Sequence, residues 1–283
     1  MLLALFVATV GHAAWDNVLH WMIVNDPDTS ILHMHWLRML FVYVFMWLVP
    51  SNSQKRTARS TCWWFAFSMY GWTLPAIAYT ICVMLSGYRI AVSFQPFIPL
   101  FVALQTGAPL EGYRLVGLNF AMLGTLSVWV WSPWYHKDPE LWKIWVSIIC
   151  ALVQVVSLSR WFSMLPETPI AYMRHGVGLS LCTIFFVMII WAPENIAADF
   201  FTRPDKWLAI LIGAGIVATC KNWVISSLSS TMRIDSVAIF ECLHPIATLC
   251  SDVILRKDMF EYEDIITITL LAIGWILYPK RNI

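Results

Sequence analysis

Charged side chains are scarce in this sequence. Asp, Glu, Lys and Arg make up 12% of its 283 residues, whereas hydrophobic residues make up 59%. Soluble domains carry about 25% charged residues, and so few charges cannot cover a surface exposed to water. The 18 Lys and Arg nearly balance the 17 Asp and Glu, so the chain also lacks the basic field that holds nucleic acid. The composition therefore predicts a membrane protein and argues against DNA and RNA as partners.

Motifs of several enzyme and metal-site classes are also missing. The seven cysteines fall in apolar runs without CxxC spacing, which favours reduced packing residues over disulfides or a zinc site. There is no GxxxxGK[ST] phosphate loop and no HExxH zinc motif. We therefore expect no cofactor and no metal site.

Ten apolar runs, each about as long as one membrane crossing, follow one another along the chain. A bilayer core about 30 Å thick takes about 20 helical residues. The runs are 2–23, 31–50, 61–85, 89–106, 113–132, 142–163, 169–192, 207–228, 233–255 and 262–279. The first could begin a signal peptide, but it lacks a basic segment and continues past Ala14 and Trp15, which favours a spanning helix. The short connections predict no soluble domain.

Basic residues indicate the orientation. With ten crossings both termini lie on one side, together with a cluster after the second run and another at the end of the chain: Lys55, Arg56, Arg59, Lys280 and Arg281. The positive-inside rule makes that side cytoplasmic. We expect a multi-pass integral protein of a bacterial cytoplasmic membrane, with both termini in the cytoplasm and the lipid bilayer as its surroundings.

The ten runs divide into a first half, residues 1–135, and a second half, residues 136–283. Halves with an odd number of spans enter the membrane in opposite orientations, as in inverted-repeat transporters. The first half contains Pro96, Glu111 and Gly124, and the second contains Pro245, Glu261 and Gly274. The Pro-to-Glu spacings are 15 and 16 residues, and the Pro-to-Gly spacings are 28 and 29. This agreement predicts an all-α membrane protein of ten transmembrane helices in two inverted five-helix repeats.

The first run contains Gly11-His12-Ala13-Ala14-Trp15-Asp16-Asn17, which is similar to the small-small-Trp-x-Asn pattern of the drug/metabolite transporter superfamily. The Pro, Glu and Gly pattern ending each half resembles its EamA-type branch. The layout matches over nearly the whole chain, but Glu261 lies in Phe-Glu-Tyr-Glu instead of a Gly-Glu turn, and the sixth run has no clear Trp-x-Asn. The resemblance implies alternating access through a cavity lined mainly by helices 1, 3, 4, 6, 8 and 9. It also implies peripheral helices 5 and 10, which could support a homodimer.

Six ionisable residues lie inside the predicted spans: Asp16, Arg38, Arg174, Lys221, Glu241 and Asp252. Each would cost about 2.5–3.5 kcal/mol at the centre of a membrane without a partner or water. Pairing or an aqueous cavity must therefore remove most of this cost.

The first run carries His12, Asp16 and His20 at spacings of four residues, with Trp15 beside them. Residues four apart share a helix face. One interpretation is a cavity stripe in which Asp16 takes a cation or a proton. The alternative is a hydrogen-bonded seam between helices.

The ninth run contains Glu241-Cys242-Leu243-His244-Pro245, and helical spacing predicts that Glu241, His244 and Asp252 share a face. Pro245 interrupts the backbone hydrogen bonding there, as transporters do at binding sites. Glu-x-x-His also occurs in di-iron bundles, but those need two copies and two further Glu, so a metal centre is disfavoured. Substrate or proton handling is the favoured interpretation.

Lys221 lies deep in the eighth run, where Glu241 or Asp16 could pair with it. It could be part of a structural ion pair or a clamp for an anion. Arg38 in the second run could meet the acidic stripe or lie near headgroups, and Arg174 and His175 occupy a similar place in the seventh. The uncharged candidates in the central runs are Tyr79, Gln95 and Gln154.

These features predict a secondary transporter, with export as the direction that the family resemblance favours. The substrate would be a small polar or charged metabolite, such as an amino acid, a nucleoside derivative or an organic anion. Histidine titrates near neutral pH, so Asp16, Glu241 and His244 are candidates for proton coupling. The alternatives are an intramembrane enzyme using His and Glu, and a membrane scaffold that transports nothing.

Overall fold

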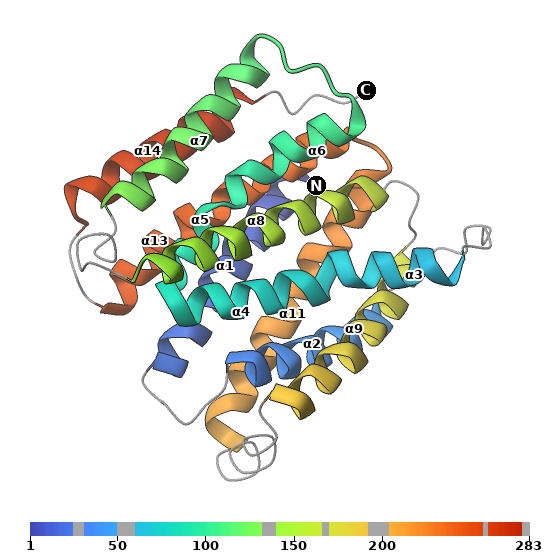
Figure 1. Cartoon of the computed structure of the whole chain (residues 1–283). Helices are drawn as coiled ribbons and strands as arrows, with labels where there is room; N and C mark the ends of the chain where they lie inside the picture. The colour runs from blue at the N-terminus through green and yellow to red at the C-terminus, as the bar shows by residue number, and fades with distance from the viewer. Residues whose placement is uncertain are drawn as a thin grey trace.

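The computed structural model describes residues 1–24, 31–49, 60–131, 140–165, 170–191, 204–256 and 260–278. All regular structure in these ranges is helical (Figure 1). The predicted all-α class is confirmed for this part of the chain.

Each apolar run coincides with one helix or with a series of short helices. The first half contains α1 (Leu2–Val24), α2 (Ile31–Leu48), α3 (Thr61–Ser68), a π-helix (Met69–Thr73), α4 (Leu74–Ser86), α5 (Tyr88–Ser93), a 3-10 turn (Gln95–Phe97), α6 (Ile98–Thr106) and α7 (Tyr113–Trp131). The second half contains α8 (Leu141–Met164), α9 (Ile170–Trp191), α11 (Pro204–Ser229), α12 (Ile234–Ala238), a 3-10 turn (Ile239–Cys242), α13 (Leu243–Arg256) and α14 (Tyr262–Leu277).

Five helical stretches in the described ranges are long and apolar enough to cross a membrane. They are Thr61–Ser86, Tyr113–Trp131, Leu141–Met164, Met173–Trp191 and Ile234–Leu255. Large apolar side chains also face outward; Leu48 and Ile190, for example, are 75% and 83% exposed. Water would oppose such exposure, whereas lipid tails accept it. The chain is therefore a multi-pass integral membrane protein, while the number of crossings stays a prediction.

Proline interrupts the helices at corresponding places in the two halves. Pro96 lies within the turn Gln95–Phe97, and Pro245 follows the turn Ile239–Cys242. Proline cannot donate a backbone hydrogen bond, so Pro96 and Pro245 each leave the carbonyl four residues earlier without its α-helical partner, which accounts for both breaks. The interruption expected at Pro245 is confirmed. The two 3-10 turns contact each other, so the breaks from both halves meet inside the molecule.

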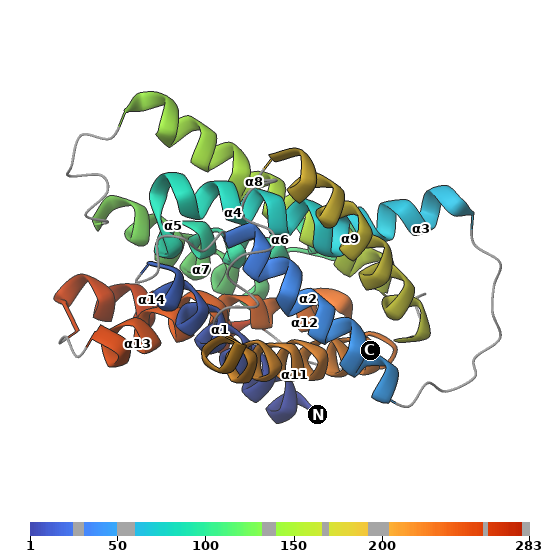
Figure 2. The same cartoon turned by 90° about the horizontal axis from the view of Figure 1, so that it is seen from below.

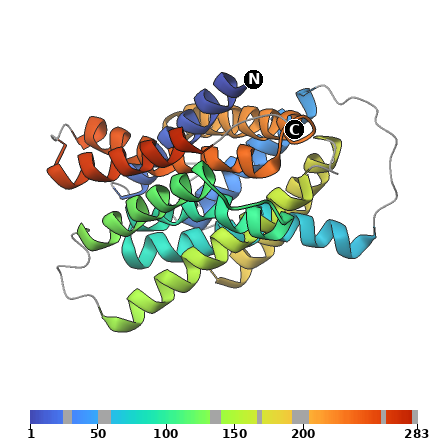
Figure 3. The ribbon, with the colours of Figure 1, turned by 90° about the horizontal axis from the view of Figure 1, so that it is seen from above.

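The helices α7 and α14 pack antiparallel through glycines, and they lie side by side in all three ribbon views (Figures 1, 2 and 3). A Cβ added to Gly117 would lie 2.9 Å from the carbonyl oxygen of Gly274, and one added to Gly274 would lie 2.7 Å from the backbone nitrogen of Ala121. Further along, the hydroxyls of Ser127 and Thr267 are 2.7 Å apart. Only residues without a side chain allow this backbone approach.

The remaining helix contacts repeat with the halves exchanged. Helix α1 of the first half packs against α11 and α13 of the second half, and α8 of the second half packs against α4 and α6 of the first half. The contact of α2 with α11 corresponds to that of α9 with α3 and the π-helix. Figure 2 shows α2 beside α9. These contacts surround the centre with helices of both halves.

Candidate functional site

A cavity of about 140 Å³ lies at this centre. Its walls come from α1, α2, the π-helix, α4, α8, α11, α13 and both 3-10 turns. Nine of the twelve predicted site residues line it: His12, Asp16, Arg38, Tyr79, Gln95, Gln154, Lys221, Glu241 and His244. The family resemblance implied helices 1, 3, 4, 6, 8 and 9 as the main lining. The cavity also includes α2, the second helix, through His35 and Arg38.

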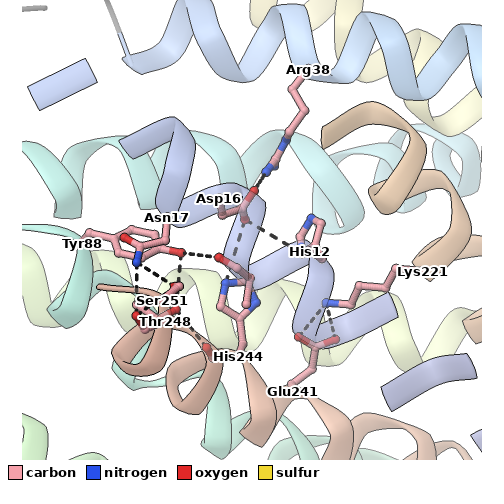
Figure 4. Close-up of polar contacts among 11 residues, drawn as sticks. His12, Asp16, Asn17, Arg38, Tyr88, Lys221, Glu241, His244, Thr248 and Ser251 are labelled. Atoms are coloured by element: carbon pink, nitrogen blue, oxygen red, sulfur yellow. Dashed lines mark hydrogen bonds and ion pairs between the residues drawn. The ribbon is translucent and has the colours of Figure 1, made fainter. Parts of the chain in front are cut away.

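Asp16 on α1 is the centre of a buried charge cluster (Figure 4). Its carboxylate accepts a hydrogen bond from the Arg38 guanidinium on α2. Nδ1 of His12 and Nε2 of His244 each lie 3.9 Å from its second oxygen. The two imidazole rings meet edge to face, with centroids 5.6 Å apart. His12 and Asp16 share the cavity-facing side of α1, whereas the side chain of His20 lies outside the described part.

Lys221 and Glu241 form a second buried ion pair. Lys221 Nζ lies 2.9 Å from Oε1 and 3.0 Å from Oε2 of Glu241, and the two side chains are 10% and 6% exposed. The predicted contact between Lys221 and Glu241 is confirmed. Asp16, the other candidate partner of Lys221, pairs with Arg38 instead. With both pairs closed and the histidines neutral, the cavity wall has no net charge.

A hydrogen-bonded seam holds α1 against α13 and α5 beside this cluster (Figure 4). Asn17 Nδ2 donates to the carbonyl of Thr248 at 3.2 Å and to the hydroxyl of Ser251 at 2.8 Å. The Tyr88 hydroxyl donates to the carbonyl of Ala13 at 3.2 Å. The seam fixes the rotation of α1, and this directs Asp16 into the cavity.

The structure adds His35, Trp72, Trp161 and Asn222 to the lining. The His35 ring meets that of Tyr79 edge to face, with centroids 4.9 Å apart. The spacing of three residues between His35 and Arg38 was a usable signal, since such residues share a helix face. Nothing in the sequence separates the two tryptophans from ordinary core aromatics.

Several polar atoms in the cavity wall have no hydrogen-bond partner among the described residues. They are His12 Nδ1, Gln95 Oε1, Gln154 Oε1, Trp161 Nε1, and both ring nitrogens of His244. Leaving such a group unsatisfied costs about 1–3 kcal/mol, and buried polar groups in native proteins nearly always have a partner. The cavity is therefore suited to hold polar molecules. In the described ranges no three His, Cys, Asp or Glu are placed to hold a metal ion.

Trp15 lies outside the cavity although Asp16 lines it. Its ring packs so closely against α11 that a Cβ on Gly213 would lie 2.7 Å from Trp15 Cζ2. The same ring packs against a buried cluster of Met34, Leu37 and Ala214. Adjacent residues on a helix point about 100° apart, so Trp15 turns toward the neighbouring helices.

Arg174 and His175 also lie outside the cavity. Arg174 Nε donates to the carbonyl of Met46 at 2.8 Å and its Nη2 donates to that of Val49, so this side chain satisfies the end of α2. Its guanidinium lies over the Trp47 ring, 5.1 Å from the centroid. His175 is exposed, and its ring meets that of Trp64 at 5.9 Å.

Asp252 was expected on one face with Glu241 and His244, but it does not line the cavity. Both His244 and Asp252 lie in α13, and Asp252 is eight residues, or about 12 Å, further along the helix axis. Arg89 donates to Asp252 instead, through Nε at 2.8 Å, and Arg89 Nη1 lies 3.3 Å from Asp264. We call Arg89, Asp252 and Asp264 the first end cluster.

A second end cluster surrounds Asp235, whose side chain is 2% exposed. The Tyr278 hydroxyl donates to its carboxylate at 2.7 Å, and Arg233 Nε donates to it at 3.1 Å. Arg114 Nη1 lies 3.9 Å away. These four residues lie at the beginnings of α7 and α12 and just after α14.

No protein-family model and no curated protein matches the chain. A solved structure described as "Crystal structure of protein" is similar, with a TM-score of 0.72 and 12% sequence identity. The match covers 97% of this chain and 96% of that one. At this identity the likeness extends to the fold alone.

Proposed function

We propose that this protein is a secondary transporter that exports a small polar or charged metabolite by alternating access. The observation that carries the proposal is the central cavity, which collects ionisable residues from both halves in the interior of a membrane protein. Intramembrane ionisable residues commonly mark substrate or proton pathways.

Two inverted five-helix repeats, residues 1–135 and 136–283, with ten crossings, form the proposed framework. The antiparallel contact of α7 with α14, and the helix contacts that repeat when the halves are exchanged, support it. The proline breaks support it further. Gln95 precedes Pro96 and His244 precedes Pro245, and both side chains line the cavity. Broken helices at the interface of two repeats are typical of transporter binding sites.

The cavity dimensions and charges favour a small substrate. A volume of about 140 Å³ is below the roughly 300–1,000 Å³ of pockets for drug-sized ligands. Among the proposed classes, this favours amino acids and small organic anions over nucleoside derivatives. Arg38 and Lys221 would attract a carboxylate, and Asp16 and Glu241 would attract an ammonium group.

Proton coupling through Asp16, Glu241 and His244 belongs to the same proposal. His244 Nε2 lies 3.9 Å from Asp16, a separation that one water molecule could bridge. A proton on His244 would weaken the attraction between Asp16 and Arg38 and so favour their separation. Substrate binding and protonation would then be linked through one carboxylate.

The membrane setting is proposed from the sequence. Both termini would face the cytoplasm of a bacterial cell, although the basic clusters at 55–59 and 280–281 lie outside the described residues. The outward positions of α7 and α14 include exposed apolar residues, such as Leu126 and Ile276. These helices lie at one edge of the molecule (Figure 1), where they would support a homodimer.

Flux measurements in proteoliposomes test the proposal. We expect saturable flux of a radiolabelled amino acid or small carboxylate, measured across a panel of both, and we expect Asp16→Asn to abolish it in protein that still folds, although the loss of the Arg38 partner lowers its stability. Lys143→Met is the matched control, because Lys143 pairs with Glu140 outside the cavity, at 3.2 Å. Absence of flux for the whole panel contradicts transport of these classes. Full activity of Asp16→Asn removes this residue from the mechanism.

A further inference from the structure

The cavity has two chemically different walls. The charged residues Asp16, Arg38, Lys221 and Glu241 come from α1, α2, α11 and the second 3-10 turn. Three of the uncharged polar residues in the lining come from the first 3-10 turn and α8: Gln95, Gln154 and Trp161. We call these three residues the neutral wall. The ion pairs give no reason for the neutral wall, because each charged group already has its partner.

All three side chains of the neutral wall are at least nine-tenths buried. Gln95 and Gln154 are each 5% exposed and Trp161 is 4% exposed. Gln95 Oε1, Gln154 Oε1 and Trp161 Nε1 nevertheless find no hydrogen-bond partner in the part of the chain that the structure describes. These three lining residues therefore carry buried hydrogen-bonding atoms of both kinds, acceptor and donor, without a described partner.

The local structure holds these groups in place. Gln95 is fixed in the turn that Pro96 imposes, and that turn contacts the opposite 3-10 turn. Gln154 and Trp161 are seven residues apart on α8, about two helical turns, so they share one face. The Trp161 ring lies so close to the π-helix that a Cβ on Gly71 would meet its Cδ1 at 2.6 Å. A fixed group loses little conformational entropy when it binds a ligand.

An aliphatic or phenyl side chain would fill each of these positions without leaving a polar atom unsatisfied. Stability alone therefore does not explain two glutamines and an indole at the wall of a membrane-protein cavity. Residues that lower stability without serving the fold are typical of binding sites. The unused atoms specify what a ligand must supply: hydrogens for the amide oxygens and a lone pair for the indole nitrogen.

We infer that the neutral wall recognises a hydroxyl or carboxamide group on a charged substrate. Either group supplies both a donor and an acceptor, and so matches both kinds of unused atom. This inference rests on the proposed function, because the charged end of the same molecule would bind the ion-pair residues. It narrows the substrate to hydroxylated or amide-bearing small ions and disfavours aliphatic ions of equal size and charge.

Matched ligand pairs test this selectivity in the purified protein. Threonine with valine, asparagine with leucine, and glycerate with 2-methylbutyrate differ by the replacement of polar groups with methyl groups. Binding is measured by titration calorimetry and transport by competition with a labelled probe. We expect the polar member of at least one pair to bind about tenfold more tightly or better, because a site built for a hydrogen bond rejects an analogue that lacks it. Equal binding within every pair overturns the inference.

Variants of the neutral wall separate it from the rest of the cavity. Gln95→Leu, Gln154→Leu and Trp161→Phe should each reduce the preference for the polar ligand to below threefold and leave binding of its apolar partner unchanged. The matched control is Gln105→Leu, because Gln105 is exposed and lies outside the cavity. This variant should keep the wild-type preference for the polar ligand. A preference that survives all three cavity variants overturns the inference.

The melting temperature without ligand gives an independent result. We expect Gln95→Leu and Gln154→Leu to leave it unchanged or raise it, because no hydrogen bond to the protein is lost. A fall of more than about 5 °C in both variants would show that these amides serve the fold, and it overturns the inference even if transport is intact. If no charged probe binds or moves in the wild-type protein, the proposed function fails and the inference fails with it.

Discussion

Two sets of buried charges in the described part of the chain differ in which halves of the sequence they join. The cavity pairs, Asp16 with Arg38 and Lys221 with Glu241, each form within one half of the chain. The two end clusters join different halves, since Arg89 of the first half binds Asp252 and Asp264 of the second. In the second end cluster Arg114 of the first half likewise faces Asp235 of the second.

Because of this difference, the cavity pairs and the end clusters would respond differently to a movement of the two halves, although both are ion pairs of similar chemistry. If the halves move relative to each other, as alternating access requires, the cavity pairs can stay closed because both members move together. The end clusters cannot stay closed, because each joins a residue of the first half to residues of the second half. We therefore expect the cavity pairs to determine which ligand binds, and the end clusters to determine how easily the protein changes conformation.

The largest effect is expected at the cavity pair Lys221–Glu241. Lys221→Met leaves a buried carboxylate without its partner, which costs about 3–5 kcal/mol, and flux should fall below detection. The double variant Lys221→Met/Glu241→Gln should regain most of the lost thermal stability, because no uncompensated charge is left. It should regain no flux, because the charges that bind the substrate are still missing. Unfolding in detergent and proteoliposome flux measure the two properties. Flux in the double variant at the wild-type rate would assign this pair to the fold alone.

A smaller effect is expected at the second end cluster. Asp235→Asn replaces a charged acceptor with a neutral amide, so it removes only part of the about 1.5–3 kcal/mol that each charge-assisted hydrogen bond from Tyr278 and Arg233 contributes. We expect a lower melting temperature, with substrate affinity within a factor of two of the wild-type value. Tyr278→Phe is the milder companion, since it removes the 2.7 Å hydrogen bond and keeps the ring. A loss of affinity without a loss of stability would contradict the distinction between the two sets.

The smallest effect on stability is expected from a change at the first end cluster that keeps its charge. The Arg89 side chain is 30% exposed, whereas the side chains of Asp252 and Asp264 are 7% and 10% exposed, so both carboxylates need a positive partner. Arg89→Lys keeps that charge and loses only the planar guanidinium that contacts both carboxylates, so it should barely change the melting temperature but should change the maximal flux several-fold, with an unchanged KM. Maximal flux and KM come from concentration series in proteoliposomes. An altered KM with unchanged maximal flux would place Arg89 with the ligand-binding groups.

Much of the fold follows from local properties of the sequence. Apolar runs and the chemistry of proline act within a few turns of helix, so the helical ranges and the break at Pro245 could be predicted. Helical periodicity also placed His12 and Asp16 on one face, and the scarcity of buried charges left Glu241 and Asp16 as the two candidate partners for Lys221. These predictions needed no knowledge of how distant helices pack.

The errors and the open alternatives arose where distant packing decides. The sequence left open whether Arg38 meets the acidic stripe or lies near headgroups, because its pairing with Asp16 depends on the rotation of α1, which Asn17 fixes through α13. Asp252 lies about 12 Å along α13 from His244, where Arg89 of α5 binds it. Arg174 was grouped with the site, whereas it satisfies the carbonyls at the end of α2. These contacts join distant helices, and no local sequence pattern predicts which residues meet.

The glycine contact between α7 and α14 limits the kinds of movement available to the molecule. Backbone atoms at Gly117 and Gly274 already approach so closely that an added methyl group would clash. Pushing the two helices together is therefore blocked. The Leu271 side chain lies against Gly124, so sliding the helices lengthwise would move it from the glycine onto residues that carry side chains. A tilt about this contact meets neither obstacle, so the glycine contact between α7 and α14 would be the pivot about which the two halves rotate.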